Sequence, residues 1–254
     1  MTDELVHYEV DRAVATITLD SPHNRNALSA QLVSELENHL ATAAEDDGIR
    51  AIVLTHTGGT FCAGADLTTA GKAVGGGGAA ASMLALLRSI AALPKPVIAR
   101  IDGHVRAGGL GVIGSCDIVV AGPASSFAFT EVRLGLAPAV ISLVTQSRMT
   151  ERAASRYYLT GEKFDAAEAE RIGLVTVAVA DVRSETEKIL AELRTCSPQG
   201  LAESKVVASR ALVSTMDADG VRVQEQSARL FASEEAAEGM RAFLERRPPR
   251  WAVE

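Results

Sequence analysis

The sequence predicts an α/β protein that ends in a helical segment. Two apolar runs, residues 51–55 (AIVLT) and 96–101 (PVIARI), have the length and composition of buried strands. Apolar residues at helical spacing predict a helix over residues 30–45, and further helices are expected at residues 181–195 and 201–212. A chain of 254 residues is long enough for one large domain, or for one domain with an appendage.

Composition excludes several classes of function. Hydrophobic residues make up 47% of the chain, which indicates a folded globular protein. The net charge is −7 and there is no basic run, which argues against a nucleic-acid partner but leaves a phosphate ligand open. No apolar run is long enough to span a bilayer, so we expect no membrane insertion. The N-terminus lacks a signal-peptide pattern, and we therefore expect a cytoplasmic protein.

The cysteine and histidine residues suggest neither a disulfide framework nor a metal site. Three cysteines (Cys62, Cys116 and Cys196) in a chain of this length indicate a reducing compartment. Buried, hydrophobe-like thiols are the simplest interpretation. Cys62 also adjoins the candidate site described below, so a thiol nucleophile is an alternative, although no His or Asn partner is apparent. The five histidines lack metal-ligand spacing, and neither a Rossmann nor a Walker pattern is present.

The first hundred residues alternate strands and helices. Residues 5–10 and 14–19 predict a strand pair around a turn at Asp11 and Arg12. A loop follows, and Ser29 is placed to cap the helix over residues 30–45. Residues 68–81 include four consecutive glycines and predict a mobile loop, either a lid or a plain connection, that leads into a helix over residues 82–93.

Two turns made of small residues follow the two buried strands. Residues 61–66 (FCAGAD) come after the first strand, and small side chains there let a ligand approach peptide N–H groups closely. Residues 103–111 (GHVRAGGLG) come after the second strand and open a helical segment, whose N-terminus offers unpaired N–H groups. Each turn alone is more simply interpreted as a tight turn with close packing. Together, the two turns would be able to hold one oxyanion between two N–H groups.

Glu131 is the strongest candidate for acid–base chemistry. It follows a short apolar strand at residues 127–129 and precedes an apolar turn. A carboxyl group in apolar surroundings has a raised pKa, which suits proton transfer near neutral pH. The alternative is an ion pair with Arg133. Downstream, Asp117 is expected to be a structural turn residue, and residues 139–149 are expected to form a helix.

These motifs together resemble the crotonase (enoyl-CoA hydratase/isomerase) family. The similarity extends over residues 10–251 and includes A-G-A-D at residues 63–66, D-G-x-x-x-x-G-G at residues 102–109 and F-x-x-x-E-x-x-x-G-x-x-P at residues 127–138. It implies a crotonase-like fold of repeated ββα units in residues 1–195 and a C-terminal helical trimerisation segment in residues 196–254. It also implies a homotrimer or a dimer of trimers, in which Arg246, Arg247 and Arg250 reach a neighbour's CoA phosphates or are ordinary surface charges.

The resemblance assigns roles to individual residues. The peptide N–H groups of Ala65 and Gly108 match the family's oxyanion hole, and Glu131 matches a catalytic glutamate. Many hydratases of the family use a second glutamate, but Gly111 stands at that position. The implied CoA and acyl contacts are His23, Asn24, Arg25, Ala63, Gly64, Asp66, Leu67 and Pro138. For Arg25, contact with a CoA phosphate and full solvation are both open.

Three functions are consistent with this sequence. The first is an enoyl-CoA hydratase, a lyase of fatty-acid metabolism, in which another group or a water replaces the glutamate missing at Gly111. The second is a Δ3,Δ2-enoyl-CoA isomerase that uses Glu131 alone. The third is an acyl-CoA-binding protein without turnover. No metal or redox cofactor is implied, because coenzyme A arrives as part of the substrate.

Overall fold

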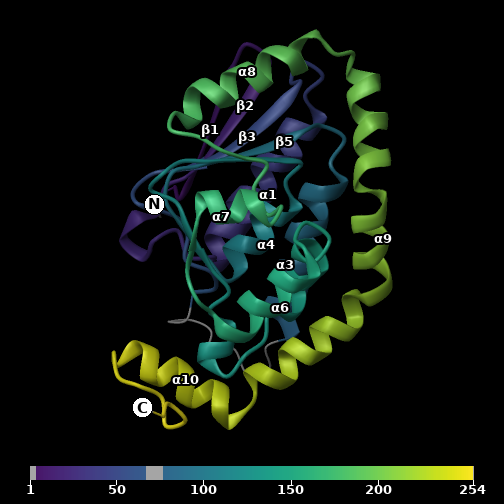
Figure 1. The fold of residues 1–254 in the computed structure, drawn as a ribbon. Coiled ribbons are helices and arrows are strands. Elements are labelled where there is room, and N and C mark those ends of the chain that lie inside the picture. The colour runs from purple at the N-terminus through teal and green to yellow at the C-terminus, as the bar shows by residue number, and fades with distance from the viewer. Residues whose placement is uncertain (1–3, 67–76, 254) are drawn as a thin grey trace.

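The computed structural model describes residues 4–66 and 77–253, which form two β-sheets surrounded by helices (Figure 1). In chain order the elements are β1 (Val6–Asp11), β2 (Val14–Leu19), η1 (Pro22–Asn24), α1 (Ala30–Glu45), β3 (Ala51–His56), β4 (Thr60–Cys62), α3 (Gly77–Ala92), β5 (Val97–Ile101), β6 (His104–Arg106), α4 (Gly108–Ser115), β7 (Ile118–Ala121), β8 (Ser126–Ala128), η2 (Glu131–Leu134), α5 (Ala139–Thr145), α6 (Glu151–Thr160), β9 (Phe164–Asp165), α7 (Ala166–Arg171), β10 (Val177–Ala178), α8 (Val182–Thr195), α9 (Pro198–Phe231) and α10 (Glu234–Leu244).

The larger sheet has the strand order β1-β2-β3-β5-β7-β10. The β1–β2 hairpin is antiparallel, and its turn residues Arg12 and Ala13 both have positive φ (45° and 62°), as a type I′ turn requires. The remaining neighbours in this sheet run parallel. Ile52 and Leu54 of β3 pack into the main core, whereas Val53 packs on the other face near Leu190 of α8. Burial on both faces explains the continuous apolar run.

The smaller sheet, β4-β6-β8-β9, gives the fold its repeated unit. A strand of the large sheet is followed by a strand of the small sheet and then by a helix, as in β3-β4-α3 and β5-β6-α4. The strands β4, β6 and β8 are parallel neighbours, so their carboxyl ends lie at one edge. This arrangement is the ββα repetition expected from the sequence, and it brings the segments after β4, β6 and β8 together.

The C-terminal helices surround this core. Figure 1 shows α8 over the larger sheet at one end of the molecule and α10 with the C-terminus at the other, with α9 running between them along one side. Helix α9 packs against α3 and α5. The expected division between residues 195 and 196 falls between α8 and α9 and stays a prediction. Within the described residues, no helix is long and apolar enough to cross a membrane.

Three expectations about element boundaries were wrong. Helix α3 starts at Gly77, so residues 77–81 are helical rather than part of a loop, because residues 79–81 are alanines and Ala80 packs into the core. Residues 68–76, on which the lid hypothesis rests, lie outside the described residues. Helix α5 ends at Thr145 rather than at residue 149. Helix α9 extends to Phe231, because its buried stripe continues through Met216, Gly220 and Val223.

Candidate active site

The two small-residue turns predicted from the sequence are in contact. Gly64 has φ +91°, and a Cβ atom there would lie 2.8 Å from the Cβ of Ala107 and 3.4 Å from the nitrogen of Gly108. A Cβ atom on Gly108 would in turn lie 3.7 Å from the Cα of Gly64. A side chain on Gly64 would therefore both strain the backbone and push the turns apart.

Pairing of the small-sheet strands causes this contact. In the parallel β4–β6 pair, Cys62 is aligned with Val105, so the chain leaves both strands at the same edge. Helix α4 also packs tightly against β4, since a Cβ on Gly109 would lie 2.8 Å from the Cβ of Cys62. Ala107 joins β6 to α4 with φ 46° and ψ −119°, a conformation that costs a non-glycine residue energy and that is found mainly at functional sites.

The edge presents two peptide N–H groups. Gly108 is the first residue of α4, all of whose residues are buried, and the first N–H groups of a helix lack partners within the helix. Ala65 forms an isolated bridge with Leu28, whose N–H donates to the carbonyl of Gly64 at 2.8 Å. The hydrogen bonds of the described residues give neither the Ala65 nor the Gly108 N–H an acceptor. The expected oxyanion donors are therefore close together and available.

Glu131 is buried at the start of η2, where Phe129 and Thr130 connect it to the end of β8. Its backbone is held in place, because its carbonyl accepts hydrogen bonds from the N–H groups of Gly135 and Leu136. Among the described residues its side-chain Oε2 has no hydrogen-bond partner. Burial raises the pKa of this carboxyl to about 7. The alternative ion pair with Arg133 is absent from the described contacts, since the Arg133 guanidinium instead reaches the carbonyl of Thr160.

Tyr158 of α6 is a polar residue near Glu131 that was not expected from the sequence. Its ring packs edge-on against Phe129 with centroids 4.7 Å apart, and its hydroxyl lies 2.5 Å from Oγ1 of Thr145. Burial raises the pKa of Tyr158 to about 12, with a smaller contribution from the charge of Glu131. An aromatic residue on a helix is typical of a core, so the sequence carries no signal that separates this tyrosine from ordinary packing residues.

Residues 9–254 match the family model described as "Enoyl-CoA hydratase/isomerase". The chain belongs to this family. It is 52% identical to an enoyl-CoA hydratase from Mycobacterium avium, with a TM-score of 0.92 and coverage of 99% of this chain and 100% of that one.

More distant relatives of the family act on different acyl groups, judging by their names. The chain is 31% identical to the mevalonyl-coenzyme A hydratase sidH of Aspergillus fumigatus, over 94% of this chain and 91% of that protein. It is 26% identical to a carnitinyl-CoA hydratase from Mycobacterium avium, with a TM-score of 0.86 and full coverage of both chains. Family membership therefore leaves the acyl group open.

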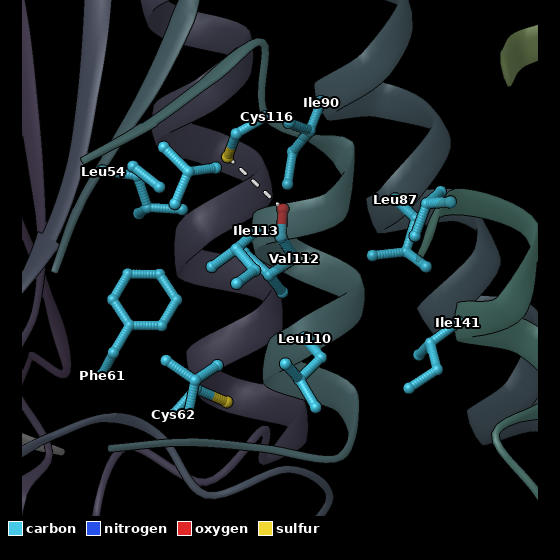
Figure 2. Close-up of a cluster of buried hydrophobic side chains, with 14 of the residues drawn as sticks. Leu54, Phe61, Cys62, Leu87, Ile90, Leu110, Val112, Ile113, Cys116 and Ile141 are labelled. Carbon is cyan, nitrogen blue, oxygen red and sulfur yellow. Dashed lines mark hydrogen bonds between the residues drawn. The ribbon is translucent and has the colours of Figure 1, made fainter. Parts of the chain in front are cut away.

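At Gly111, the position of the second glutamate in many hydratases of the family, the space is filled. A Cβ atom there would lie 2.6 Å from Cγ2 of Ile141 in α5 and 3.2 Å from Cδ1 of Leu87 in α3. Figure 2 shows both side chains directed towards α4 from neighbouring helices. The side chains of Ile141 and Leu87 are both hydrocarbon, so neither can transfer a proton as a carboxylate does.

The loop expected to contact CoA lies beside the first oxyanion turn. The carbonyl of Arg25 accepts the N–H of Ala63 at 3.1 Å, and the side chains of Arg25 and His23 are exposed. Asn24 has a structural role, because its Oδ1 accepts from the Ser21 hydroxyl and from the N–H of Ala27. The buried side chain of Asn26, for which no role was expected from the sequence, holds the loop through Ser21, Thr57 and Thr60.

The remaining expected residues are distributed around the site. Pro138 is the buried residue that precedes α5, and Asp66 is half-buried beside Ala65. Leu67 lies outside the described residues. Cys62 is fully buried, and burial raises the pKa of its thiol to about 12, which argues against the thiolate nucleophile considered from the sequence.

Proposed function

We propose that the chain hydrates a 2-enoyl-CoA thioester with Glu131 as its single proton-transferring carboxyl. The observation that supports this proposal best is the buried Glu131 carboxyl, whose Oε2 has no partner among the described residues. A buried carboxyl without a partner is costly to a protein and is characteristic of catalytic sites. The family of the chain and the name of its Mycobacterium avium relative agree with this reaction.

The two N–H groups of Ala65 and Gly108 would receive the thioester oxygen. Addition of water to C3 moves electrons from the C2=C3 bond towards that oxygen and produces an enolate-like intermediate. Donors fixed in advance stabilise such an oxygen, and one donor typically contributes about 10²–10³-fold to the rate. The contact between Gly64 and the Ala107–Gly108 turn keeps both donors at the same edge of the site.

Glu131 would carry the proton in both directions. As the carboxylate, it takes a proton from water while the water oxygen bonds to C3; as the acid, it returns that proton to C2 when the enolate collapses. A pKa of about 7 keeps both forms populated near neutral pH. With one carboxyl instead of two, we expect slow hydration, because a positioned acid or base contributes about 10²–10⁴-fold.

A second candidate, Δ3,Δ2-enoyl-CoA isomerisation, is favoured by the hydrocarbon filling at Gly111. In this reaction Glu131 removes a proton from C2 of a 3-enoyl thioester. The C2=C3 bond forms, the C3=C4 bond becomes single, and Glu131 donates the proton to C4. The reaction requires the same oxyanion donors and needs neither water nor a second carboxyl.

Coenzyme A binding and assembly complete the proposal. The loop with His23, Asn24 and Arg25 would contact the CoA moiety, and Ala63, Gly64, Asp66, Leu67 and Pro138 would contact the acyl thioester. No separate cofactor is needed. We also propose a cytoplasmic trimer or dimer of trimers, which is supported by the exposure of Val207 and Val221 on α9 and Phe243 on α10.

The deciding test follows loss of the conjugated enoyl-thioester absorbance of crotonyl-CoA with wild type and Glu131→Gln. We expect measurable hydration by wild type and at least a roughly 10²-fold loss in the variant. If wild type is silent, the same pair is tested with a 3-enoyl-CoA, where gain of absorbance identifies the isomerase. Silence with both substrates would reject turnover and leave an acyl-CoA-binding protein, which direct binding of a saturated acyl-CoA would detect.

A further inference from the structure

Helix α10 packs directly on η2, the short helix that begins with Glu131. Figure 1 shows α10 in yellow at the end of the molecule opposite α8, and the buried residues of α10 include Gly239. Among the described residues, the three atoms nearest to a Cβ on Gly239 would be backbone atoms of Leu134, the closest at 2.5 Å. Backbone atoms cannot rotate away as the end of a long side chain can, so this contact leaves no room for a methyl group.

A second glycine makes the same kind of contact in the opposite direction. Gly135 follows η2 with φ +71°, and a Cβ there would lie 2.7 Å from the carbonyl carbon and 2.8 Å from the carbonyl oxygen of Glu235 in α10. One glycine on each side therefore lets the two backbones meet. A backbone contact at two points restrains both the distance and the orientation of η2 relative to α10.

Backbone hydrogen bonds connect this contact to Glu131. The Glu131 carbonyl accepts the N–H of Gly135 and, at 3.0 Å, the N–H of Leu136. Helix η2 also meets α6, where a Cβ on Gly161 would lie 3.1 Å from Cγ1 of Val132. Because η2 is held by both helices and is hydrogen-bonded within itself, a displacement of η2 at α10 would move Glu131.

The C-terminal tail holds α10 through the carboxylate of Glu238, the residue before Gly239. Its two oxygens accept from the Arg247 guanidinium at 2.7 and 3.0 Å, and Oε1 also accepts the N–H of Arg250 at 3.0 Å. The hydrogen bonds from Arg247 lower the pKa of Glu238 to about 2. The Glu238–Arg247 ion pair therefore stays charged over the pH range in which Glu131 titrates.

The titratable groups on the elements packed around Glu131 leave its own titration distinguishable. Tyr158 on α6, with a pKa raised by burial to about 12, stays neutral in the same range. Glu235 on α10 meets η2 through backbone atoms, and the Arg133 guanidinium of η2 reaches the carbonyl of Thr160. Burial is the main cause of the raised pKa of Glu131, so that pKa reports how well the carboxyl is enclosed.

We propose that α10 positions the proton-carrying carboxyl, and that Gly239, through its contact with Leu134, is the positioning residue that keeps η2 and Glu131 in their buried place. The inference rests on the proposed function, because it assigns a role relative to the proton carrier of that reaction. It makes the last helix of the chain part of what turnover requires, in addition to a segment for self-association. Since Gly239 acts through η2, loss of its contact should lower turnover more than substrate binding.

The test compares wild type with Gly239→Ala on whichever substrate wild type turns over, crotonyl-CoA or a 3-enoyl-CoA. The added methyl group meets Leu134 and moves η2. We expect kcat to fall about 10²-fold with KM little changed, because a displacement of about 1 Å costs a reaction roughly this much. The acidic limb of the kcat pH profile should also move from about 7 towards the ordinary value of 4.5, because a displaced carboxyl is less buried.

Gly220→Ala in α9 is the matched control, because it is the same change at a buried helical glycine and meets the end of the Leu84 side chain, which can rotate. It should leave kcat and the pH profile as in wild type. Lys205→Met shows what lost stability does by itself and should not move the acidic limb. Unchanged kcat and an unchanged profile in Gly239→Ala would overturn the proposal. A loss of kcat with an unmoved limb would overturn it too, since general damage would then be responsible.

Arg247→Gln tests the same contact if Gly239→Ala does not fold. It removes the ion pair that holds α10 and adds no atoms at η2, and we expect a smaller shift of the acidic limb in the same direction. Arg88→Gln is its control, because the Arg88–Asp217 pair at 2.7 Å is exposed and joins α3 to α9. An acidic limb that stays in place in Arg247→Gln as in Arg88→Gln would contradict a positioning role of α10.

A stability titration separates this inference from the proposed function. The difference in the free energy of urea unfolding between wild type and Glu131→Gln, followed from pH ~5 to pH ~8, reports the titration of Glu131 without any turnover. In a Gly239→Ala background, the pH-dependent part of this difference should fall by at least about half. An undiminished difference overturns this inference even when wild type is active. Wild type that is silent on both substrates overturns the proposed function, and the titration then still decides whether α10 keeps Glu131 buried.

Discussion

At the scale of single residues, the Glu131 carboxyl links activity to stability. Its pKa is about 7 in the folded protein against an ordinary value of 4.5, so between these pH values the folded state binds the proton that the unfolded state releases. Folding stability consequently falls as the pH rises from 4.5 to 7. Above pH 7 the folded protein carries the full cost of a buried, ionised carboxyl, which is about 3 kcal/mol for a shift of this size.

The first prediction follows from this linkage. Glu131→Gln should stabilise the protein by up to about 3 kcal/mol near pH ~8, because the amide never ionises, and by much less near pH ~5. Urea unfolding of wild type and variant at both pH values measures the difference. A variant that is equally or less stable than wild type at the higher pH would show that the carboxyl is not ionised in a buried state.

The second prediction concerns the contact between the two oxyanion turns. Gly64→Ala should lower kcat/KM by about 10²–10³-fold, because the new methyl group meets Ala107 and moves one N–H donor away from the other. Gly59→Ala is the matched control, since a Cβ there would have no neighbour within 4 Å. Similar activity of the two variants would mean that the proximity of the turns is not needed.

Residues with distinctive chemistry were predictable from the sequence, whereas residues with ordinary packing chemistry were not. A lone glutamate between apolar segments and two glycine-rich turns after strands are local patterns, and they mark Glu131 and the two turns as candidates. The resemblance to the crotonase family then points to Ala65 and Gly108 within the turns, and the roles of all three residues stay predictions. Ile141 and Tyr158 look like core residues on helices, and their relation to the site depends on which helices pack together. Which helices pack together is determined by the tertiary fold and cannot be read from a local pattern.

At the scale of elements, one buried lysine fastens α9 to the core. Nζ of Lys205 lies 2.8 Å from the Asp117 carboxylate and donates to the carbonyls of Ile90 and Lys95 at 2.9 Å each. Burial lowers the pKa of Lys205, and the Asp117 charge opposes that shift. Asp117 also accepts the N–H of Val97, so the structural role expected for this aspartate is consistent with its contacts.

The third prediction is that Lys205→Met destabilises the protein by about 3 kcal/mol, because the change removes the buried positive charge that pairs with Asp117 and the donor to two carbonyls. Chemical denaturation provides the measurement. Lys188→Met is the matched control, since the Lys188–Glu185 pair at 2.8 Å is exposed to solvent that screens its charges, and its loss should change stability little. Equal losses for the two lysines would contradict the proposed anchoring of α9.

The accuracy of the element predictions depended on how local the determining signal is. Helix α1 occupies residues 30–45 as expected, because its apolar stripe and the Ser29 cap, which accepts the N–H of Leu32, are both local. The extent of α9 was underestimated, since beyond residue 212 only Met216 and Val223 of its buried stripe are apolar, and Gly220 between them does not count as apolar in a pattern. The burial of Gly220 is created by the elements that pack against α9, where a Cβ atom would lie 2.7 Å from Leu84 of α3.

At the scale of the whole molecule, the C-terminal helices leave apolar side chains in solvent. Val207 is 76% exposed and Val221 is 68% exposed on α9, and Phe243 is 58% exposed on α10. A contiguous exposed apolar surface marks protein–protein contacts, and we propose that these side chains belong to one. The arrangement supports the proposed self-association through residues 196–254.

The fourth prediction is that the protein sediments as an assembly of three or six chains and that Val207→Asp shifts it towards smaller species. A charge placed in an apolar contact between subunits is not compensated, so association should weaken. Analytical ultracentrifugation at several concentrations measures the effect. Val10→Asp, which changes a 53% exposed valine on β1, is the matched control and should leave the assembly unchanged.

The fit of Gly111 against Ile141 also constrains how such a site can change through successive mutations. A glutamate introduced first at position 111 meets a filled space, so that single step is expected to damage the fold without improving chemistry. A smaller residue introduced first at position 141 creates the room but has no use until the carboxylate arrives. The effect of each substitution therefore depends on the other, and a path to a site with two carboxylates has a preferred order in which Ile141 changes before Gly111.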